Sequence, residues 1–200
     1  MKNILAGAVT SVSLLLAMSA ANATVITEIE ANDSFATAQY VEGSFSTGAN
    51  ADVENAGVAG WEWVSIEAGP DTTSSYDYFT FSVAAGQQFI FDIDYGCETT
   101  ECDDSDTDVD TFIRLFDGSN GLIGFSDDEG PDLFDSLLAF EFDYTGTATL
   151  KVSQFEDSVM PSGTDYTLQI SREQQAVSVP EPGSLLLLSL GLAMLGLRRQ

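Results

Sequence analysis

Short segments in which apolar and polar residues alternate recur along the middle of the chain. In residues 77–83, Phe79, Phe81 and Val83 fall on one side. The other such segments are residues 89–95, 112–116, 122–125, 138–144, 148–152 and 166–170. Alternation with period two places apolar residues on one face of a β-strand, and no segment has a convincing helical period. Because Gly, Asp, Asn and Ser separate the segments, the pattern predicts an all-β fold, an antiparallel β-sandwich of seven or eight strands.

Two stretches add detail to this arrangement. Residues 112–116 and 122–125 flank Asp117-Gly118-Ser119-Asn120-Gly121, which has the composition of a hairpin turn. Residues 43–75 are less regular, and we expect them to form a long insertion or an irregular edge.

The N-terminus has the pattern of a secretory signal peptide. A basic start at Met1-Lys2-Asn3 precedes an apolar stretch around residues 12–17, and Ala21-Asn22-Ala23 has the small-x-small form of a cleavage site. We therefore expect cleavage after Ala23, so that residues 1–23 are removed. A membrane anchor that stays attached is the alternative.

The C-terminus combines a short motif, an apolar run and two arginines. Pro180, Glu181 and Pro182 precede an apolar run over residues 183–197, which Arg198 and Arg199 follow. At about 1.5 Å per residue a helix of this length reaches about 23 Å, short of the ~30 Å hydrocarbon core of a bilayer. Arginines favour the cytoplasmic side, so the run predicts a marginal tail anchor in an exported protein.

This ending resembles the PEP-CTERM sorting signal of Gram-negative bacteria. The resemblance implies that exosortase, a membrane cysteine protease, removes the tail as the protein passes from the inner membrane to the cell surface or extracellular matrix. Exopolysaccharide production commonly accompanies such proteins. The expected organisation is a signal peptide at residues 1–23, one domain at 24–178 and the sorting signal with its short transmembrane helix at 179–200.

Four stretches of the middle domain resemble, in order, the bacterial pre-peptidase C-terminal (PPC) domain. They are residues 28–38, 77–81, 110–117 and 166–170. The resemblance implies a jelly-roll-like β-sandwich related to the collagen-binding domains of clostridial collagenases, without catalytic activity of its own.

The charge of the chain excludes several function classes. It holds 32 Asp and Glu against 6 Lys and Arg, a net charge of −26, and it has no histidine. Nucleic-acid binding needs clustered basic residues, so it is not expected. Without histidine, neither a Ser-His-Asp group nor an imidazole zinc site can be built. The hydrophobic content of 44% is nevertheless enough for a folded core.

The opening segment of the domain is a candidate calcium site. Its oxygen-bearing side chains are Glu28, Glu30, Asn32 and Asp33. Calcium takes six to eight oxygen ligands. In the collagen-binding relatives this segment ligates calcium together with the aspartate before the Tyr-Phe strand, which is Asp77 here. A further aspartate of the relatives is replaced by Ser74, and a solvated acidic arm is the alternative.

A second acidic cluster surrounds the predicted hairpin. If its strands pair, Asp108 and Asp110 come near Asp127 and Asp128. Like charges this close repel unless a cation or a proton relieves them. A second calcium site and a solvated acidic loop are both open readings of this cluster.

Two other features have competing interpretations. Cys97 and Cys102 are the only cysteines of an exported chain, and we expect a disulfide between them. Trp61 and Trp63 could contact a sugar, although rings in an irregular segment more often cover the edge of a core.

The sequence thus predicts a non-catalytic surface or matrix module, stabilised by calcium, sorted by exosortase and associated with exopolysaccharide or a matrix protein. The alternatives are a polysaccharide hydrolase that uses two carboxylates, and a purely structural spacer.

Overall fold

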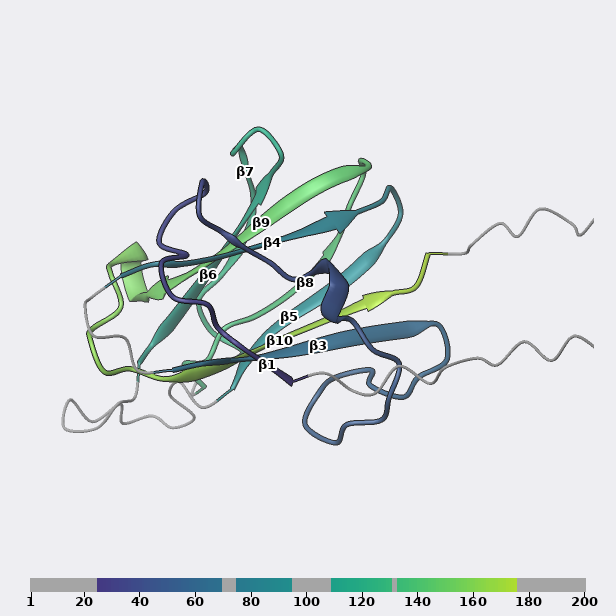
Figure 1. Ribbon diagram of the computed structural model, residues 1–200, viewed down its shortest axis with the longest axis horizontal. Helices are drawn as coiled ribbons and strands as arrows, with labels where there is room; N and C mark the ends of the chain where they lie inside the picture. Colours follow the sequence, from purple (N-terminus) through teal and green to yellow (C-terminus); the bar gives the residue numbers. More distant parts are fainter. Residues whose placement is uncertain (1–24, 70–74, 95–108, 131–132, 176–200) are drawn as a thin grey trace, which may run out of the picture.

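The computed structural model describes residues 25–69, 75–94, 109–130 and 133–175, and within them ten strands form two facing five-stranded sheets (Figure 1). No α-helix occurs in this part of the chain, so the prediction of an all-β sandwich is confirmed. The strands are β1 (Val25–Thr27), β2 (Gln39–Tyr40), β3 (Trp61–Ala68), β4 (Asp77–Val83), β5 (Gln88–Asp94), β6 (Thr111–Asp117), β7 (Leu122–Ser126), β8 (Leu137–Glu141), β9 (Gly146–Gln154) and β10 (Tyr166–Glu173). Two 3₁₀ turns, η1 (Glu42–Ser44) and η2 (Phe155–Asp157), complete the set.

The first sheet has the strand order β1-β3-β10-β5-β8, and the second has the order β2-β4-β9-β6-β7. All pairings are antiparallel except β1 with β3 and β2 with β4, which are parallel. The sheets are therefore mixed, where the sequence predicts antiparallel ones. The difference arises because residues 25–40 give a short edge strand to the first sheet and then cross over to give one to the second.

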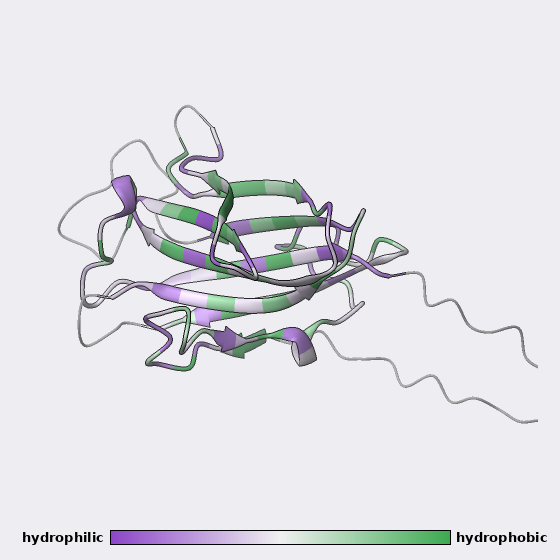
Figure 2. Ribbon diagram, turned by 90° about the horizontal axis from the view of Figure 1, so that it is seen from above, coloured by the Kyte–Doolittle hydropathy of each residue, from purple (hydrophilic) through white to green (hydrophobic). Residues whose placement is uncertain are grey.

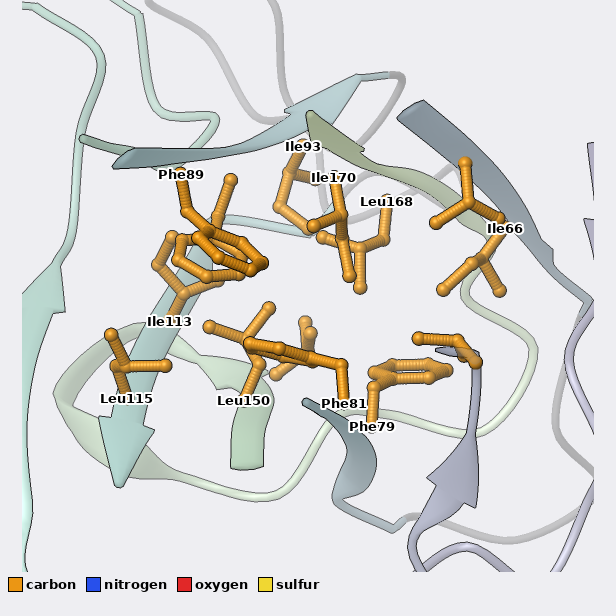
Figure 3. Packing of buried hydrophobic residues seen from close by; sticks show 14 of the residues in the cluster. Ile66, Phe79, Phe81, Phe89, Ile93, Ile113, Leu115, Leu150, Leu168 and Ile170 are labelled. Atoms are coloured by element: carbon orange, nitrogen blue, oxygen red, sulfur yellow. The ribbon is translucent and has the colours of Figure 1, made fainter. Parts of the chain in front are cut away.

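Apolar side chains fill the space between the sheets. Figure 3 shows Ile66, Phe89, Ile93, Leu168 and Ile170 of the first sheet pointing toward Phe79, Phe81, Ile113, Leu115 and Leu150 of the second. All ten are fully buried, and each contributes about 1.5–3 kcal/mol relative to an exposed position. The alternation along the strands is visible as changing colour in Figure 2. The alternating pattern therefore predicts correctly which side chains of these strands are buried.

Strand β3 is the element that the sequence does not predict. Residues 43–75 are expected to be irregular, yet β3 lies between β1 and β10 in the first sheet. Its inward residues Val64 and Ile66 are buried, and so are Trp63 and Ser65 on the other face. The segment before β3 lies against that face, since the Trp63 indole Nε1 donates a 2.6 Å hydrogen bond to the Gly48 carbonyl oxygen. A strand buried on both faces shows no alternation, which explains the wrong expectation.

The hairpin β6–β7 forms as predicted. Asp117 Oδ1 accepts hydrogen bonds from the backbone N–H groups of Ser119 and Gly121, both at 2.8 Å, which fixes the turn. Along β7, a Cβ at Gly124 would meet the ring of Phe140 at 3.3 Å, so a glycine permits the close approach of β7 to β8. These two strands adjoin at one edge of the sandwich.

The predicted terminal segments, 1–23 and 179–200, lie outside the described residues. Within the described residues, no helix is long and apolar enough to cross a bilayer.

Candidate functional site

Three aspartates meet at one end of the β6–β7 hairpin. Asp110 directly precedes β6, and Asp127 and Asp128 directly follow β7. Because Ile113 pairs with Ser126, the start of one strand lies beside the end of the other. One carboxylate oxygen from each aspartate lies within 4.8 Å of the other two. The predicted meeting of these three residues is confirmed, whereas Asp108 lies outside the described residues.

The backbone around this cluster is held by Ser136. Its Oγ lies 2.8 Å from the Thr111 carbonyl oxygen and 2.9 Å from the Asp127 carbonyl oxygen. The Asp110 carbonyl oxygen accepts a hydrogen bond of 2.9 Å from the Phe155 N–H. The aspartates are therefore fixed in place by their main chain. Ser136 is a supporting residue that the sequence does not single out, because it carries no charge and is eight residues from the nearest of the three aspartates.

The carboxylates themselves are poorly satisfied. Oδ1 of Asp110 and Oδ1 of Asp127 are buried and accept no hydrogen bond from the described part of the chain. Burial, followed by the charges of Asp127 and Asp128, raises the pKa of Asp110 to about 6. Burial, followed by the charge of Asp128, also raises the pKa of Asp127. Either a bound cation or a proton would reduce the repulsion between these carboxylates and the free-energy cost of burying their charge.

These pKa shifts predict that the stability of the metal-free protein depends on pH. With its pKa raised above the ordinary 3.8, Asp110 binds a proton more readily in the folded state than in the unfolded state. Its ionised form therefore destabilises the fold above pH ~6, and the effect fades as the pH falls through that value. In a chelator, we expect Asp110→Asn to melt at a higher temperature than the parent at pH 8, and by a smaller margin at pH 5. An equal difference in melting temperature at the two pH values would contradict the raised pKa of Asp110.

The predicted N-terminal site is built on the segment that follows β1. Asn32 Nδ2 donates a hydrogen bond of 2.7 Å to Glu28 Oε1, and both side chains are buried. Between them Ala31 has φ 75, a left-handed conformation that is costly for a residue with a Cβ. This turn lets the two side chains meet. Glu30 and Asp33 are exposed instead.

Asp77 lies next to this segment. The backbone N–H of Tyr78 donates to the Asn32 carbonyl oxygen at 3.1 Å, which holds the segment against the start of β4. Asp77 is buried, and its Oδ2 accepts a 2.7 Å hydrogen bond from the Tyr166 hydroxyl of the opposite sheet. The sequence predicts a strand over residues 166–170 but assigns Tyr166 no part in the site. A tyrosine on an inward face needs a partner for its hydroxyl, and that signal in the sequence points to a nearby polar group.

The remaining predicted features divide between described and undescribed residues. Trp63 is buried, and its Nε1 donates to the Gly48 carbonyl oxygen at 2.6 Å, so this ring covers the sheet and offers no face to a sugar. Trp61 is only half-buried and lines a pocket with Phe140 and Glu141. Cys97 and Cys102 lie outside the described residues, and their disulfide stays a prediction.

Comparison with protein families identifies the C-terminal segment. Residues 178–200 match the PEP-CTERM protein-sorting motif. The chain carries a PEP-CTERM sorting signal. The prediction made from Pro180, Glu181, Pro182, Arg198 and Arg199 is thereby confirmed. The PEP-CTERM signal implies passage through the membrane, processing by exosortase and export to the outside of a Gram-negative cell.

Solved structures show what the exported domain is similar to. The pre-peptidase C-terminal domain of collagenase from Bacillus anthracis is 15% identical, with 55% of this chain and 87% of that domain covered and a TM-score of 0.35. PliG, a periplasmic inhibitor of g-type lysozyme from Aeromonas hydrophila, is 16% identical, with 60% of this chain and 93% of PliG covered and a TM-score of 0.37. No curated protein matches the sequence at a significant level.

Proposed function

We propose that this protein is a non-catalytic module of the cell surface or extracellular matrix, that calcium stabilises its fold, and that it associates with exopolysaccharide or a matrix protein. The PEP-CTERM signal supports the destination, because it implies export by exosortase. The lack of histidine supports a binding or structural role, because the commonest general base of enzymes is missing.

The observation that carries the calcium proposal is the orientation of Asn32. Its side chain is 1% exposed, and its Oδ1 accepts no hydrogen bond from any described residue. An unsatisfied carbonyl oxygen at this depth costs about 1–3 kcal/mol. The Nδ2 of the same amide already donates to Glu28, so Oδ1 is left to bind something else. A cation bound beside the Glu28 carboxylate would give the Asn32 oxygen its missing partner.

Oxygen ligands favour calcium over other metals here. Carboxylate and amide oxygens suit hard cations, whereas zinc is usually bound through cysteine and histidine. Asp110, Asp127 and Asp128 supply a second set of the same type, with two buried oxygens that lack a described partner. We propose that Glu28, Asn32 and Asp77 belong to one calcium site and the three hairpin aspartates to another. Glu30 and Asp33 would complete the first site from the surface, and Asp108 is proposed as a further ligand of the second.

Thermal melting in calcium and in a chelator tests the proposal. Binding to the folded state alone contributes about 2.7 kcal/mol at a calcium concentration of 100 Kd, and each kcal/mol raises the melting temperature of a domain of this size by about 2–4 °C. We expect millimolar calcium to raise the melting temperature of the exported chain by about 5–10 °C. Asn32→Ala and Asp127→Asn should each reduce that shift.

Asp143→Asn is the matched control, because Asp143 is an exposed aspartate outside both groups. It should keep the full calcium shift. Equal melting temperatures of the parent chain in calcium and in chelator would refute the calcium proposal. Co-sedimentation with polysaccharide purified from the same bacterium tests the matrix association.

A further inference from the structure

A third group of polar side chains lies on the outer face of the first sheet. Asp92 and Asp94 occupy alternate positions of β5, and Gln169 is on the adjacent strand β10. Gln169 pairs directly with Asp92, and Thr167 pairs with Asp94. Their sequence neighbours Phe91, Ile93, Leu168 and Ile170 point inward, so the three polar side chains point to the other face. No part of the two sites above contributes to this group.

The Gln169 side chain contacts the Asp94 carboxylate through one of its two amide atoms only. Its Nε2 donates a short hydrogen bond to Asp94 Oδ2, along the diagonal between the two strands. The residue is only 3% exposed, and its Oε1 is buried and accepts no hydrogen bond from the described residues. Since both atoms belong to one amide, Oε1 lies close to the Asp94 carboxylate, and Asp92 is the residue directly opposite on β5. A buried amide oxygen in this position needs a donor or a cation.

The charged groups that act on Asp92 are all negative. Burial, followed by the negative charges of Asp94, Glu129, Glu54 and Asp135 in that order, raises the pKa of Asp92 to about 7. The three Lys and Arg side chains of the described chain form ion pairs elsewhere, with Asp157, Glu42 and Glu62. The group therefore has an excess of negative charge that the ion pairs of those three side chains do not relieve.

The group is sheltered from bulk water. On the same outer face, Ser65 and Ser171 are buried, and so is Val53 in the segment that leads into β3. A cation beside partly buried carboxylates interacts more strongly with them than it would on an open surface, because screening by water is reduced. A half-buried pair of aspartates with a buried amide oxygen is the ligand type that calcium takes.

We infer that Asp92, Asp94 and Gln169 bind a divalent cation, with calcium as the best-fitting ion, on the outer face of the first sheet. This ion would give Gln169 Oε1 its partner and relieve the repulsion between the two carboxylates. A proton on Asp92, donated to Gln169 Oε1, is the competing arrangement, and the experiment below separates the two.

Calcium titration of the full chain by calorimetry at pH 8 provides the test. At this pH, above the pKa of about 7, Asp92 is mostly ionised and competition from protons is small. We expect Asp92→Asn to remove one bound calcium ion or to weaken one class of sites at least tenfold. Gln169→Met, which keeps the length of the side chain without its oxygen, should act in the same direction. Asp143→Asn should titrate like the parent.

Melting in chelator distinguishes the cation from the proton. Asn at position 92 removes a costly buried charge, so Asp92→Asn should raise the melting temperature in chelator while it reduces the gain from calcium. If Asp92→Asn raises both melting temperatures equally and titrates like the parent, the proton arrangement holds and the inference is wrong. Asp92→Asn is nearly isosteric, so the test stands even if Gln169→Met does not fold. Variants Asn32→Ala and Asp127→Asn report separately on the two sites proposed above, so failure of one proposal is not failure of the other.

Discussion

Replacement of Arg172 by alanine is expected to lower the free energy of unfolding by about 3–5 kcal/mol, because it removes the cation from a buried network and leaves two carboxylates behind. Arg172 Nε lies 2.7 Å from Glu62 Oε1, and Nη2 lies 2.8 Å from Glu42 Oε1. The Arg172 side chain is only 8% exposed, and its guanidinium lies 3.7 Å from the centre of the Phe45 ring. The variant should melt about 6–20 °C below the parent in calorimetry.

Two control variants isolate the cause. Arg172→Lys keeps the charge but loses the planar fork that contacts both glutamates, so it should recover only part of the stability. Arg114→Ala removes a more exposed cation that pairs with Asp157, and we expect a loss of about 1 kcal/mol or less. If Arg172→Ala and Arg114→Ala melt at the same temperature, the ion pairs of Arg172 contribute no more to stability than the more exposed pair of Arg114.

Phe81→Ala is expected to destabilise the fold by about 3–5 kcal/mol, the range for truncation of a buried phenylalanine. The Phe81 ring lies between the two sheets, with its centre 5.2 Å from that of Phe89 and 5.5 Å from that of Phe91. Truncation removes these ring contacts and leaves a cavity that neighbouring strands, each hydrogen-bonded in its sheet, cannot close. Urea unfolding with a common m-value would measure the difference.

Phe125→Ala serves as the control for this prediction. Phe125 lies on the edge strand β7 and is 62% exposed, so the same change of side chain should cost much less. A loss below about 1 kcal/mol in Phe81→Ala would show that the space between the sheets collapses around the cavity.

Alternation predicted the strands that have one buried and one open face. Phe79, Phe81 and Phe89 are buried as the pattern requires, and the turn composition of residues 117–121 placed the hairpin correctly. Because a hairpin fixes which residues lie opposite, the meeting of Asp110 with Asp127 and Asp128 could also be predicted. This part of the candidate site depends only on local pairing.

Features that depend on contacts distant in sequence could not be predicted in the same way. Strand β3 is covered on both faces, so its pattern lacks the alternation of an open strand. The Tyr166 hydroxyl reaches Asp77 across the sandwich, 89 positions away. Gln169 reaches Asp94 across adjacent strands of one sheet, and no local signal in either segment indicates the pairing. The parallel edge strands β1 and β2 form because residues 25–40 pass from the first sheet to the second. Strands of two or three residues are too short to show an alternating pattern in the sequence.

The placement of the basic residues also determines how the domain responds to digestion by trypsin, which cleaves after Lys and Arg. Arg114, Lys151 and Arg172 lie on β6, β9 and β10, and each of these strands has a neighbour on both sides. The other basic residues of the chain, Lys2, Arg198 and Arg199, are at its ends. Cleavage within the described domain would therefore require strands to leave the middle of a sheet, so its rate would follow the opening of the whole sandwich and not the fraying of a loop.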